Sequence, residues 1–201
     1  MYPFSVLMSI YKGDNPSFLD NSLNSIFNQT LLPNEIVLIK DGILNKKLNS
    51  VVDNYARANT IPFKIIENKK NRGLGYSLKV GVEASSNEII ARMDADDVSY
   101  PNRLGEQVRF LEKNPHVSVL GTYASLFDDN GVIWGNNCPP IEPILDDWLK
   151  GPSVIHASVI MNKKKLEDMG GYDTKALRIE DYDLWLRMLS KDYLIHTLPN
   201  E

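Results

Sequence analysis

The chain has 201 residues, a net charge of −4 and one cysteine, and 43% of its residues are hydrophobic. This length and composition predict one globular domain with a sizeable core and exclude a disordered chain. The lone cysteine excludes an internal disulfide and a cysteine-based zinc site, and the lack of a basic block argues against nucleic-acid binding.

Apolar, β-prone runs alternate with helical patterns through the first half of the chain. Asn15 followed by Pro16 is typical of a helix start. The alternation of strand and helix predicts an α/β domain with a mostly parallel central sheet and flanking helices. We expect strands over residues 4–10, 35–40, 63–66 and 89–93, and helices over residues 16–30, 48–55 and 74–82.

The second half changes character and predicts a smaller, mixed region. The stretch Asp128-Asp129-Asn130-Gly131 predicts a hairpin turn between two strands. Residues 135–152 are rich in Pro, Gly and Asn, which predicts a loop with one short helix over residues 144–149. We expect helices over residues 101–113, 163–169 and 181–191, and strands over residues 117–127, 132–134, 154–161 and 193–198.

Polar residues follow several of the predicted parallel strands. In a parallel α/β sheet, ligands bind beyond the carboxyl ends of the strands. The polar side chains at or just beyond those ends are Ser9, Tyr11, Asp41, Asn71, Asp94 and Asp96. Several polar strand ends at one edge of a sheet predict a binding site there.

Asp94, Asp96 and Asp97 place three carboxylates within four residues, directly after the strand 89–93. Like charges this close raise one another's pKa, and an unpaired buried charge is costly. A hard divalent cation would relieve both effects, since Mg²⁺ and Mn²⁺ take carboxylate ligands and bridge to phosphates. An acidic turn without a metal is the simpler alternative.

Two further polar turns have both a structural and a functional interpretation. Asp41-Gly42 is either a plain turn or a carboxylate that accepts hydrogen bonds from a base or a ribose. The stretch Asn71-Arg72-Gly73-Leu74-Gly75 is either a tight turn or an anion site at a helix N-terminus. Its spacing matches neither a Walker loop nor a dinucleotide-binding fingerprint.

Glu180, Asp181 and His156 are candidates from the second half. An acidic residue at a helix N-terminus is most often a cap, but one of these two carboxylates could be a general base aimed at an incoming hydroxyl. His156 is expected within a strand, where it either packs in the core or contacts a phosphate or a metal.

Taken in order, these motifs resemble family 2 glycosyltransferases of the GT-A fold over nearly the whole chain, in the variety that builds bacterial exopolysaccharide, O-antigen or capsule. The Gln-X-X-Arg-Trp element and the membrane spans of processive members are absent, which favours a single-addition transferase. The resemblance rests on Ser9-Ile10-Tyr11, Asp41-Gly42, Asn71-Arg72-Gly73, Met93-Asp94-Ala95-Asp96-Asp97, Gly170-Gly171-Tyr172-Asp173 and Glu180-Asp181-Tyr182-Asp183-Leu184-Trp185-Leu186-Arg187.

The resemblance implies that residues 1–97 bind a nucleotide-diphosphate sugar, often a UDP-sugar. It places Asp94 at the ribose with Ala95 beside it, and Mn²⁺ or Mg²⁺ on Asp96 with help from Asp97. The residues that it places around the base are Ser9, Tyr11, Asp41 and Asn71, with Arg72 as their neighbour.

The resemblance also implies that residues 98–201 bind the acceptor and supply the proton chemistry. Asp181 would be the base that deprotonates the acceptor hydroxyl, with Glu180 beside it. His156 and Gly171 would lie near the donor sugar and the acceptor. The implied acceptor is a saccharide or a lipid-linked saccharide.

The predicted function is thus an inverting, metal-dependent sugar transfer in surface polysaccharide synthesis. One alternative is a sugar-nucleotide nucleotidyltransferase, although residues 9–13 lack the Gly-rich, Arg-containing loop of such enzymes. The other is an inactive nucleotide-sugar-binding domain. With no apolar run of membrane-spanning length and no signal-peptide pattern, we expect a cytoplasmic protein, or one at the inner face of the plasma membrane. The end directly after a strand predicts a C-terminal truncation.

Overall fold

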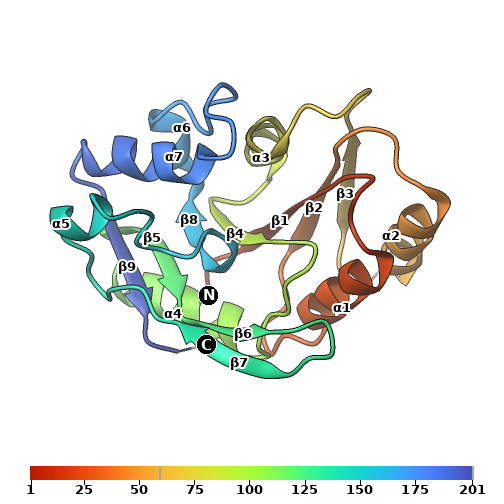
Figure 1. Cartoon of the computed structure of the whole chain (residues 1–201), viewed down its shortest axis with the longest axis horizontal. Helices are drawn as coiled ribbons and strands as arrows, with labels where there is room; N and C mark the ends of the chain where they lie inside the picture. The colour runs from red at the N-terminus through yellow and green to blue at the C-terminus, as the bar shows by residue number, and fades with distance from the viewer. Residues whose placement is uncertain (59, 201) are drawn as a thin grey trace.

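The protein is described by a computed structural model that covers residues 1–58 and 60–200 (Figure 1). Its centre is a seven-stranded sheet with the strand order β3-β2-β1-β4-β8-β5-β9. Neighbouring strands pair in parallel except where β8 runs antiparallel to both β4 and β5. These strands are β1 (Phe4–Ile10), β2 (Glu35–Lys40), β3 (Phe63–Glu67), β4 (Ile89–Met93), β5 (Val117–Thr122), β8 (Ile160–Asn162) and β9 (Leu194–Leu198). The mostly parallel α/β sheet predicted from the sequence is confirmed.

Helices cover both faces of the sheet, and each face has its own apolar cluster. One cluster includes side chains of α1 (Pro16–Phe27), α2 (Lys46–Ala58) and α4 (Arg103–Lys113). The opposite cluster includes side chains of α3 (Leu74–Ala84), α5 (Leu145–Trp148), α6 (Lys163–Asp168) and α7 (Glu180–Leu189). Because helices bury both faces, the central strands carry apolar side chains on both faces.

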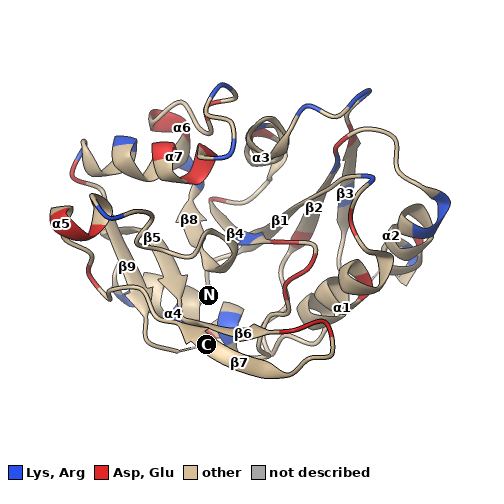
Figure 2. Cartoon of the chain, in the orientation of Figure 1, with Lys and Arg blue, Asp and Glu red and all other residues tan. Residues whose placement is uncertain are grey.

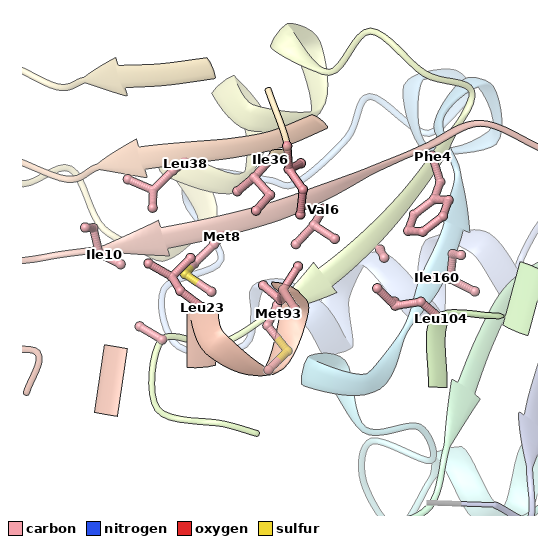
Figure 3. Close-up of a cluster of buried hydrophobic side chains, with 14 of the residues drawn as sticks. Phe4, Val6, Met8, Ile10, Leu23, Ile36, Leu38, Met93, Leu104 and Ile160 are labelled. Carbon is pink, nitrogen blue, oxygen red and sulfur yellow. The ribbon is translucent and has the colours of Figure 1, made fainter. Parts of the chain in front are cut away.

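The central strands divide their side chains between the two clusters in alternation, as the period of a β-strand requires. On β1, Val6 and Met8 enter the cluster beneath α1, whereas Leu7 enters the opposite one. Figure 3 shows Val6 and Met8 among Ile36, Leu38 and Leu23. The parallel register of β1 with β2 and β4 brings the carboxyl ends of all three strands to one edge of the sheet.

The expected strand over residues 117–127 is wrong, because the chain leaves the main sheet at Tyr123. The backbone N–H of Tyr123 makes the last contact with the main sheet, by donating to the carbonyls of Leu198, at the end of β9, and of Asn200. β6 (Ala124–Phe127) then pairs antiparallel with β7 (Ile133–Asn137) in a separate two-stranded sheet. The predicted hairpin turn between these two strands is confirmed.

The expected strand over residues 154–161 is also wrong in its first part. A 3₁₀ helix, η1 (His156–Ser158), precedes the short strand β8. The hydroxyl of Ser158 donates to the carbonyl of Ile155, and it accepts from the backbone N–H of Thr122 at 2.9 Å. These side-chain bonds compete with strand pairing and tighten the backbone into a turn. His156 therefore lies on a 3₁₀ helix and not in a strand.

Candidate active site

The acidic cluster, which consists of Asp94, Asp96 and Asp97, lies in the loop after β4. One carboxylate oxygen from each residue lies within 4.8 Å of the others. Figure 2 shows acidic residues in this loop. Burial and the charges of Asp94 and Asp96 together raise the pKa of Asp97 to about 6, against the opposing charges of Arg92 and Arg103. The three carboxylates that the sequence places close together therefore do converge.

Asp14 is a fourth carboxylate beside this cluster, and it was not among the residues predicted from the sequence. Its Oδ2 atom accepts a hydrogen bond of 2.7 Å from the backbone N–H of Tyr11, in the loop after β1. Burial and the charges of Asp96 and Asp94 raise the pKa of Asp14 to about 6. The hydrogen bond from the Tyr11 N–H acts in the opposite direction. The loops after β1 and β4 thus approach each other with four acidic groups.

Oxygen ligands from several carboxylates suit a hard divalent cation such as Mg²⁺ or Mn²⁺. The raised pKa values of Asp14 and Asp97 indicate that burial and mutual repulsion disfavour the ionised carboxylates. A bound cation would reverse this electrostatic cost. The residues present therefore fit a divalent metal ion.

A polar stripe, formed by two residues of α1 and by Gln29 just beyond its end, holds the loop that carries the acidic cluster. Ser22 donates a hydrogen bond of 2.7 Å from its hydroxyl to the carbonyl of Asp94. Ser25 accepts a bond from the backbone N–H of Ser99, and Gln29 donates to the carbonyl of Tyr100 at 2.7 Å. Three polar residues at helical spacing are the sequence signal that could have identified this stripe.

Arg92 lies beneath the acidic cluster on the face of the sheet that α3 and α7 cover. It is 2% exposed and forms an ion pair with Asp94. Its Nε and Nη1 atoms have no hydrogen-bond partner in the described part of the chain. On the other face, the buried Arg103 donates to the carbonyl of Arg92 at 2.9 Å. Two buried guanidinium groups therefore flank the end of β4 and offset part of its negative charge.

Asp41 is 4% exposed and organises the turn between β3 and α3. Its carboxylate accepts hydrogen bonds from the backbone N–H groups of Arg72 (2.8 Å) and Gly73 (2.9 Å), and from the side chain of Asn68 (2.9 Å). Gly73 has a φ of +89°, which favours glycine. This turn therefore depends both on the glycine at position 73 and on the contacts with Asp41. Asn71 and Arg72 are exposed on the turn, and the Arg72 guanidinium lies 4.0 Å over the Tyr76 ring.

Ser9, Tyr11 and Ala95 complete the residues predicted along this edge. Ser9 is partly buried at the end of β1, and the Tyr11 ring is 47% exposed. A Cβ atom on Gly13 would come within 2.5 Å of the Tyr11 ring, so the ring lies directly over the Gly13 backbone. The methyl group of Ala95 packs in the core and is 7% exposed, which leaves its backbone as the part that could reach a ligand.

The second-half candidates gather around Tyr172, a fully buried residue that the sequence analysis did not select. His156 Nε2 lies 2.8 Å from the Tyr172 hydroxyl oxygen. Burial raises the pKa of Tyr172, the charge of Arg92 opposes this, and Asp181 and Glu180 add to it. The start of α7 is therefore close enough to Tyr172 to act on it electrostatically. Burial, with the charge of Arg92, lowers the pKa of His156 well below its ordinary value.

The capping interpretation of Glu180-Asp181 is not supported by the described residues. The N-cap of α7 is Ile179, and no side chain caps this helix end. Asp181 lies in the first turn, which leaves its carboxylate for another role. Arg187 anchors the same helix, since its guanidinium donates to the carbonyls of Met169 and Gly171. The Arg187 bond holds Gly171 beside α7. Gly171 has a φ of +69°, a conformation that favours glycine.

The model of the family described as glycosyl transferase family 2 matches residues 5–170. An amylovoran biosynthesis glycosyltransferase of Erwinia amylovora, AmsE, is 35% identical over 199 residues, which is 98% of this chain and 73% of that protein. A UDP-Gal:alpha-D-GlcNAc-diphosphoundecaprenol beta-1,3-galactosyltransferase of Escherichia coli is 35% identical over 191 residues, which is 93% of this chain and 68% of that protein.

Solved structures share the fold at lower identity. Staphylococcus aureus TarS superposes with a TM-score of 0.76 at 19% identity, over 99% of this chain and 35% of TarS. The mannosyltransferase PcManGT from Pyrobaculum calidifontis, in complex with GDP-Man and Mn²⁺, gives a TM-score of 0.75 at 17% identity, over 98% of this chain and 55% of that one. The chain thus spans about a third to a half of these structures.

No helix within residues 1–58 and 60–200 combines the length and the apolar character needed to cross a membrane. The family match, the curated relatives and the shared fold agree with one another. The chain belongs to glycosyl transferase family 2 and is a glycosyltransferase of the GT-A fold.

Proposed function

We propose that the protein is an inverting, metal-dependent glycosyltransferase that moves a sugar from a UDP-sugar to a hydroxyl of a saccharide or lipid-linked saccharide. Residues 1–97 would bind the donor, and residues 98–201 would bind the acceptor. The galactosyltransferase relative is named for UDP-Gal and for a lipid-linked acceptor, and a TarS fragment of similar fold was solved with UDP-GlcNAc. These names favour a UDP-sugar donor and a lipid-linked saccharide acceptor.

The observation that carries this proposal is the convergence of Asp94, Asp96 and Asp97, with oxygen atoms within 4.8 Å of one another. When bound there, a divalent cation such as Mn²⁺ would neutralise charge on the leaving diphosphate. Asp96 and Asp97 would hold the cation, and Asp94 would face the ribose from its ion pair with Arg92. Asp14 adds negative charge beside them, since the charges of Asp96 and Asp94 act on it.

The base of the nucleotide would bind over the first three strands. The exposed Tyr11 ring offers a stacking surface, and stacking on aromatic rings is a common way to hold a base. Asp41 and Asn71 lie at the ends of the neighbouring strands, where a base would meet them. Arg72 is held over Tyr76 beside this turn. Ser9 and the backbone of Ala95 would line the floor of the site.

Proton removal from the acceptor would fall to Asp181. Its place in the first turn of α7, without a capping role, leaves the carboxylate as a general base. Glu180 lies beside it, His156 contacts the Tyr172 hydroxyl, and Arg187 of α7 donates to the carbonyl of Gly171. Attack by the activated hydroxyl on the face opposite the diphosphate inverts the anomeric centre.

Donor hydrolysis and acceptor transfer test the two halves of this proposal separately. We expect Mn²⁺-dependent hydrolysis in a screen of UDP-, GDP- and dTDP-sugars, with UDP-sugars preferred. Asp96→Asn should abolish the rise in melting temperature that UDP with Mn²⁺ produces, whereas Asp129→Asn, an exposed change on the hairpin, should keep it. Loss of the shift in both variants, or in neither, would contradict the metal assignment.

Asp181→Asn should abolish transfer while leaving UDP binding unchanged, and Asp168→Asn at the exposed end of α6 serves as the matched control. Near-normal turnover of Asp181→Asn would overturn the choice of base. Release of pyrophosphate from a nucleoside triphosphate would instead favour a nucleotidyltransferase. A protein whose melting temperature does not respond to UDP with Mn²⁺ would be an inactive domain of the family.

A further inference from the structure

The loops that follow β2 and β3 meet at the carboxyl-end edge of the sheet, the edge that also carries the acidic cluster. A Cβ atom on Gly42 would come within 2.7 Å of the backbone nitrogen of Asn71, so the two loops are in direct backbone contact. Ile43 of the first loop and Lys69 of the second line one small hollow. The exposed side chains of both loops therefore form one continuous surface.

This surface carries four exposed lysines, which we call the basic rim: Lys46, Lys47, Lys69 and Lys70. Figure 2 shows basic residues at the start of α2 and on the loop after β3. None of the four has an ion-pair partner within residues 1–58 and 60–200. Residues 42–47 and 68–73 contain no acidic residue. The basic rim is therefore a patch of uncompensated positive charge on a protein whose net charge is −4.

The two lysines of the basic rim that open α2 stand where a cation is unfavourable. The N-terminus of a helix carries partial positive charge, so acidic residues stabilise it and basic residues do not. The first turn of α2 has no acidic residue, and the helix starts with Lys46 and Lys47. Local preferences that conflict in this way are typical of functional surfaces. An external anionic surface would offset both the helix charge and the lysine charge.

Ile43 projects from the middle of this basic surface. Its side chain is 85% exposed, whereas its neighbour Leu44 is buried in the core. The side chain of Asn45 accepts a bond of 3.0 Å from the backbone N–H of Leu48, and Asn49 donates to the carbonyl of Leu44 at 3.3 Å. These bonds fix the loop with Leu44 turned inward and Ile43 turned outward.

An exposed apolar side chain among lysines matches an anionic lipid surface. The lysines attract acidic headgroups, and the apolar side chain enters the interface between headgroups and acyl chains. We propose that the basic rim and Ile43 dock the protein on an anionic membrane surface, with the active-site edge of the sheet toward the lipid. The inference deepens the proposed function and rests on it for its purpose, because a lipid-linked acceptor would be held at the surface that this edge meets.

Nucleic acid matches this surface less well than lipid does. Proteins that hold single strands stack bases on aromatic rings, and residues 42–47 and 68–73 contain no aromatic residue. Ile43 would also stay in water beside a phosphate backbone, without the gain from apolar burial that a lipid interface provides.

Sedimentation with vesicles tests the docking surface directly. One set of vesicles is phosphatidylcholine alone, and the other is phosphatidylcholine and phosphatidylglycerol in equal parts. Lys46→Gln/Lys47→Gln removes two charges of the basic rim. The matched control, Lys113→Gln/Lys191→Gln, removes two exposed lysines that precede β5 and β9. Because β5 and β9 run in the same direction as β4, these control lysines lie at the opposite edge of the sheet.

We expect the wild-type protein to bind the anionic vesicles, to bind phosphatidylcholine weakly, and to lose the anionic binding in about 1 M salt, where the Debye length is roughly 3 Å. A lysine near an anionic surface contributes about fivefold in affinity, so the rim variant should bind roughly 30-fold more weakly. The control variant should bind as the wild type does. The melting temperature of the rim variant should not fall, because the change relieves the charge conflict at the start of α2.

Ile43→Ser separates a lipid surface from a nucleic acid. Ile144→Ser, which changes another exposed isoleucine, is its matched control. Vesicle binding should weaken by about tenfold in Ile43→Ser, because apolar burial is lost, and should not change in Ile144→Ser. A short duplex DNA that binds as tightly as the anionic vesicles, with no effect of Ile43→Ser on either ligand, would overturn the lipid assignment.

The docking surface is also contradicted if the rim variant binds anionic vesicles as tightly as its control, or if the wild type binds neither kind of vesicle. A rim variant with weakened UDP binding and unchanged vesicle binding would show that the lysines attract the donor instead. Sedimentation needs neither nucleotide nor metal, so it is independent of donor binding. A protein that binds UDP with Mn²⁺ but no vesicles contradicts the docking surface alone, and one that binds vesicles but not UDP contradicts the proposed function alone.

Discussion

Arg92 and Asp94 form an ion pair directly beneath the acidic cluster, with the arginine side chain 3% exposed and the aspartate side chain 36% exposed. The two residues are separated by one position in the chain. Their ion pair connects a buried face of the sheet to the candidate donor site. The guanidinium also acts electrostatically on His156 and Tyr172. One buried cation therefore influences both the donor side and the acceptor side of the site.

Replacing Arg92 with Met should separate a structural role from a functional one. The change removes a buried charge with two unpartnered nitrogen atoms, so we expect the melting temperature to change by only a few degrees. Asp94 loses its partner, and we expect the affinity for UDP with Mn²⁺ to fall by about tenfold, or ~1.4 kcal/mol. Calorimetry and thermal unfolding measure the two effects, and a variant that binds UDP normally would contradict the positioning role of Arg92.

Gln29→Leu tests whether the polar stripe holds the acidic loop in place. The amide of Gln29 donates to the carbonyl of Tyr100 and accepts from the backbone N–H of Leu104 at 3.1 Å. Leaving these buried groups without partners should lower the free energy of unfolding by about 1–3 kcal/mol. Mn²⁺-dependent UDP binding should weaken as well. Urea unfolding checks the first effect, with the exposed Thr30→Ala as control.

Asp41→Ala should loosen the turn that precedes α3. The backbone N–H groups of Arg72 and Gly73 lose their acceptors, at a cost of about 1–3 kcal/mol. Hydrogen exchange at these two amides should accelerate, whereas exchange at amides within α7 should not change. We expect nucleotide affinity to fall in parallel. Unchanged protection at Arg72 and Gly73 would show that the carboxylate does not organise the turn.

Metal-free stability should depend on pH through Asp97, whose pKa rises from 3.8 to about 6 in the folded protein. Above pH 6 the Asp97 carboxylate is ionised in both the folded and the unfolded state. Its burial and its repulsion from Asp94 and Asp96 then oppose folding. As the pH falls from 6 to 3.8, the folded state takes up a proton before the unfolded state does, so this group's contribution to stability rises. A shift of roughly two pKa units limits the effect to ~3 kcal/mol.

Asp97→Asn removes this titration. With EDTA present, the variant should be more stable than the wild type at pH 8, and the difference should shrink as the pH falls toward 4. Comparing the two proteins at each pH cancels the contributions of other groups, such as His156, whose lowered pKa has the opposite effect. Thermal unfolding across this pH range measures the difference. A difference that stays constant with pH would contradict the raised pKa of Asp97.

The sequence by itself determined the elements with strong local patterns. Asn15 and Pro16 predicted the start of α1, and the side chain of Asn15 does accept from the backbone N–H of Ser17 at 2.9 Å. Four apolar residues in β2 predicted a strand buried on both faces. The order of strands and helices then brought the polar strand ends to one edge. These features depend on neighbours close in the chain, which is why a linear pattern reveals them.

The tertiary structure alone decided where that pattern breaks and which distant groups meet. The chain leaves the main sheet after Tyr123, whose N–H donates to the carbonyls of residues 198 and 200, and the turn at η1 depends on a bond between Ser158 and Thr122. The pairing of His156 with Tyr172, and the approach of Asp14 to the acidic cluster, join segments separated by many residues. Burial and charge act through space, so their effect on a carboxylate cannot be read from its neighbours in sequence.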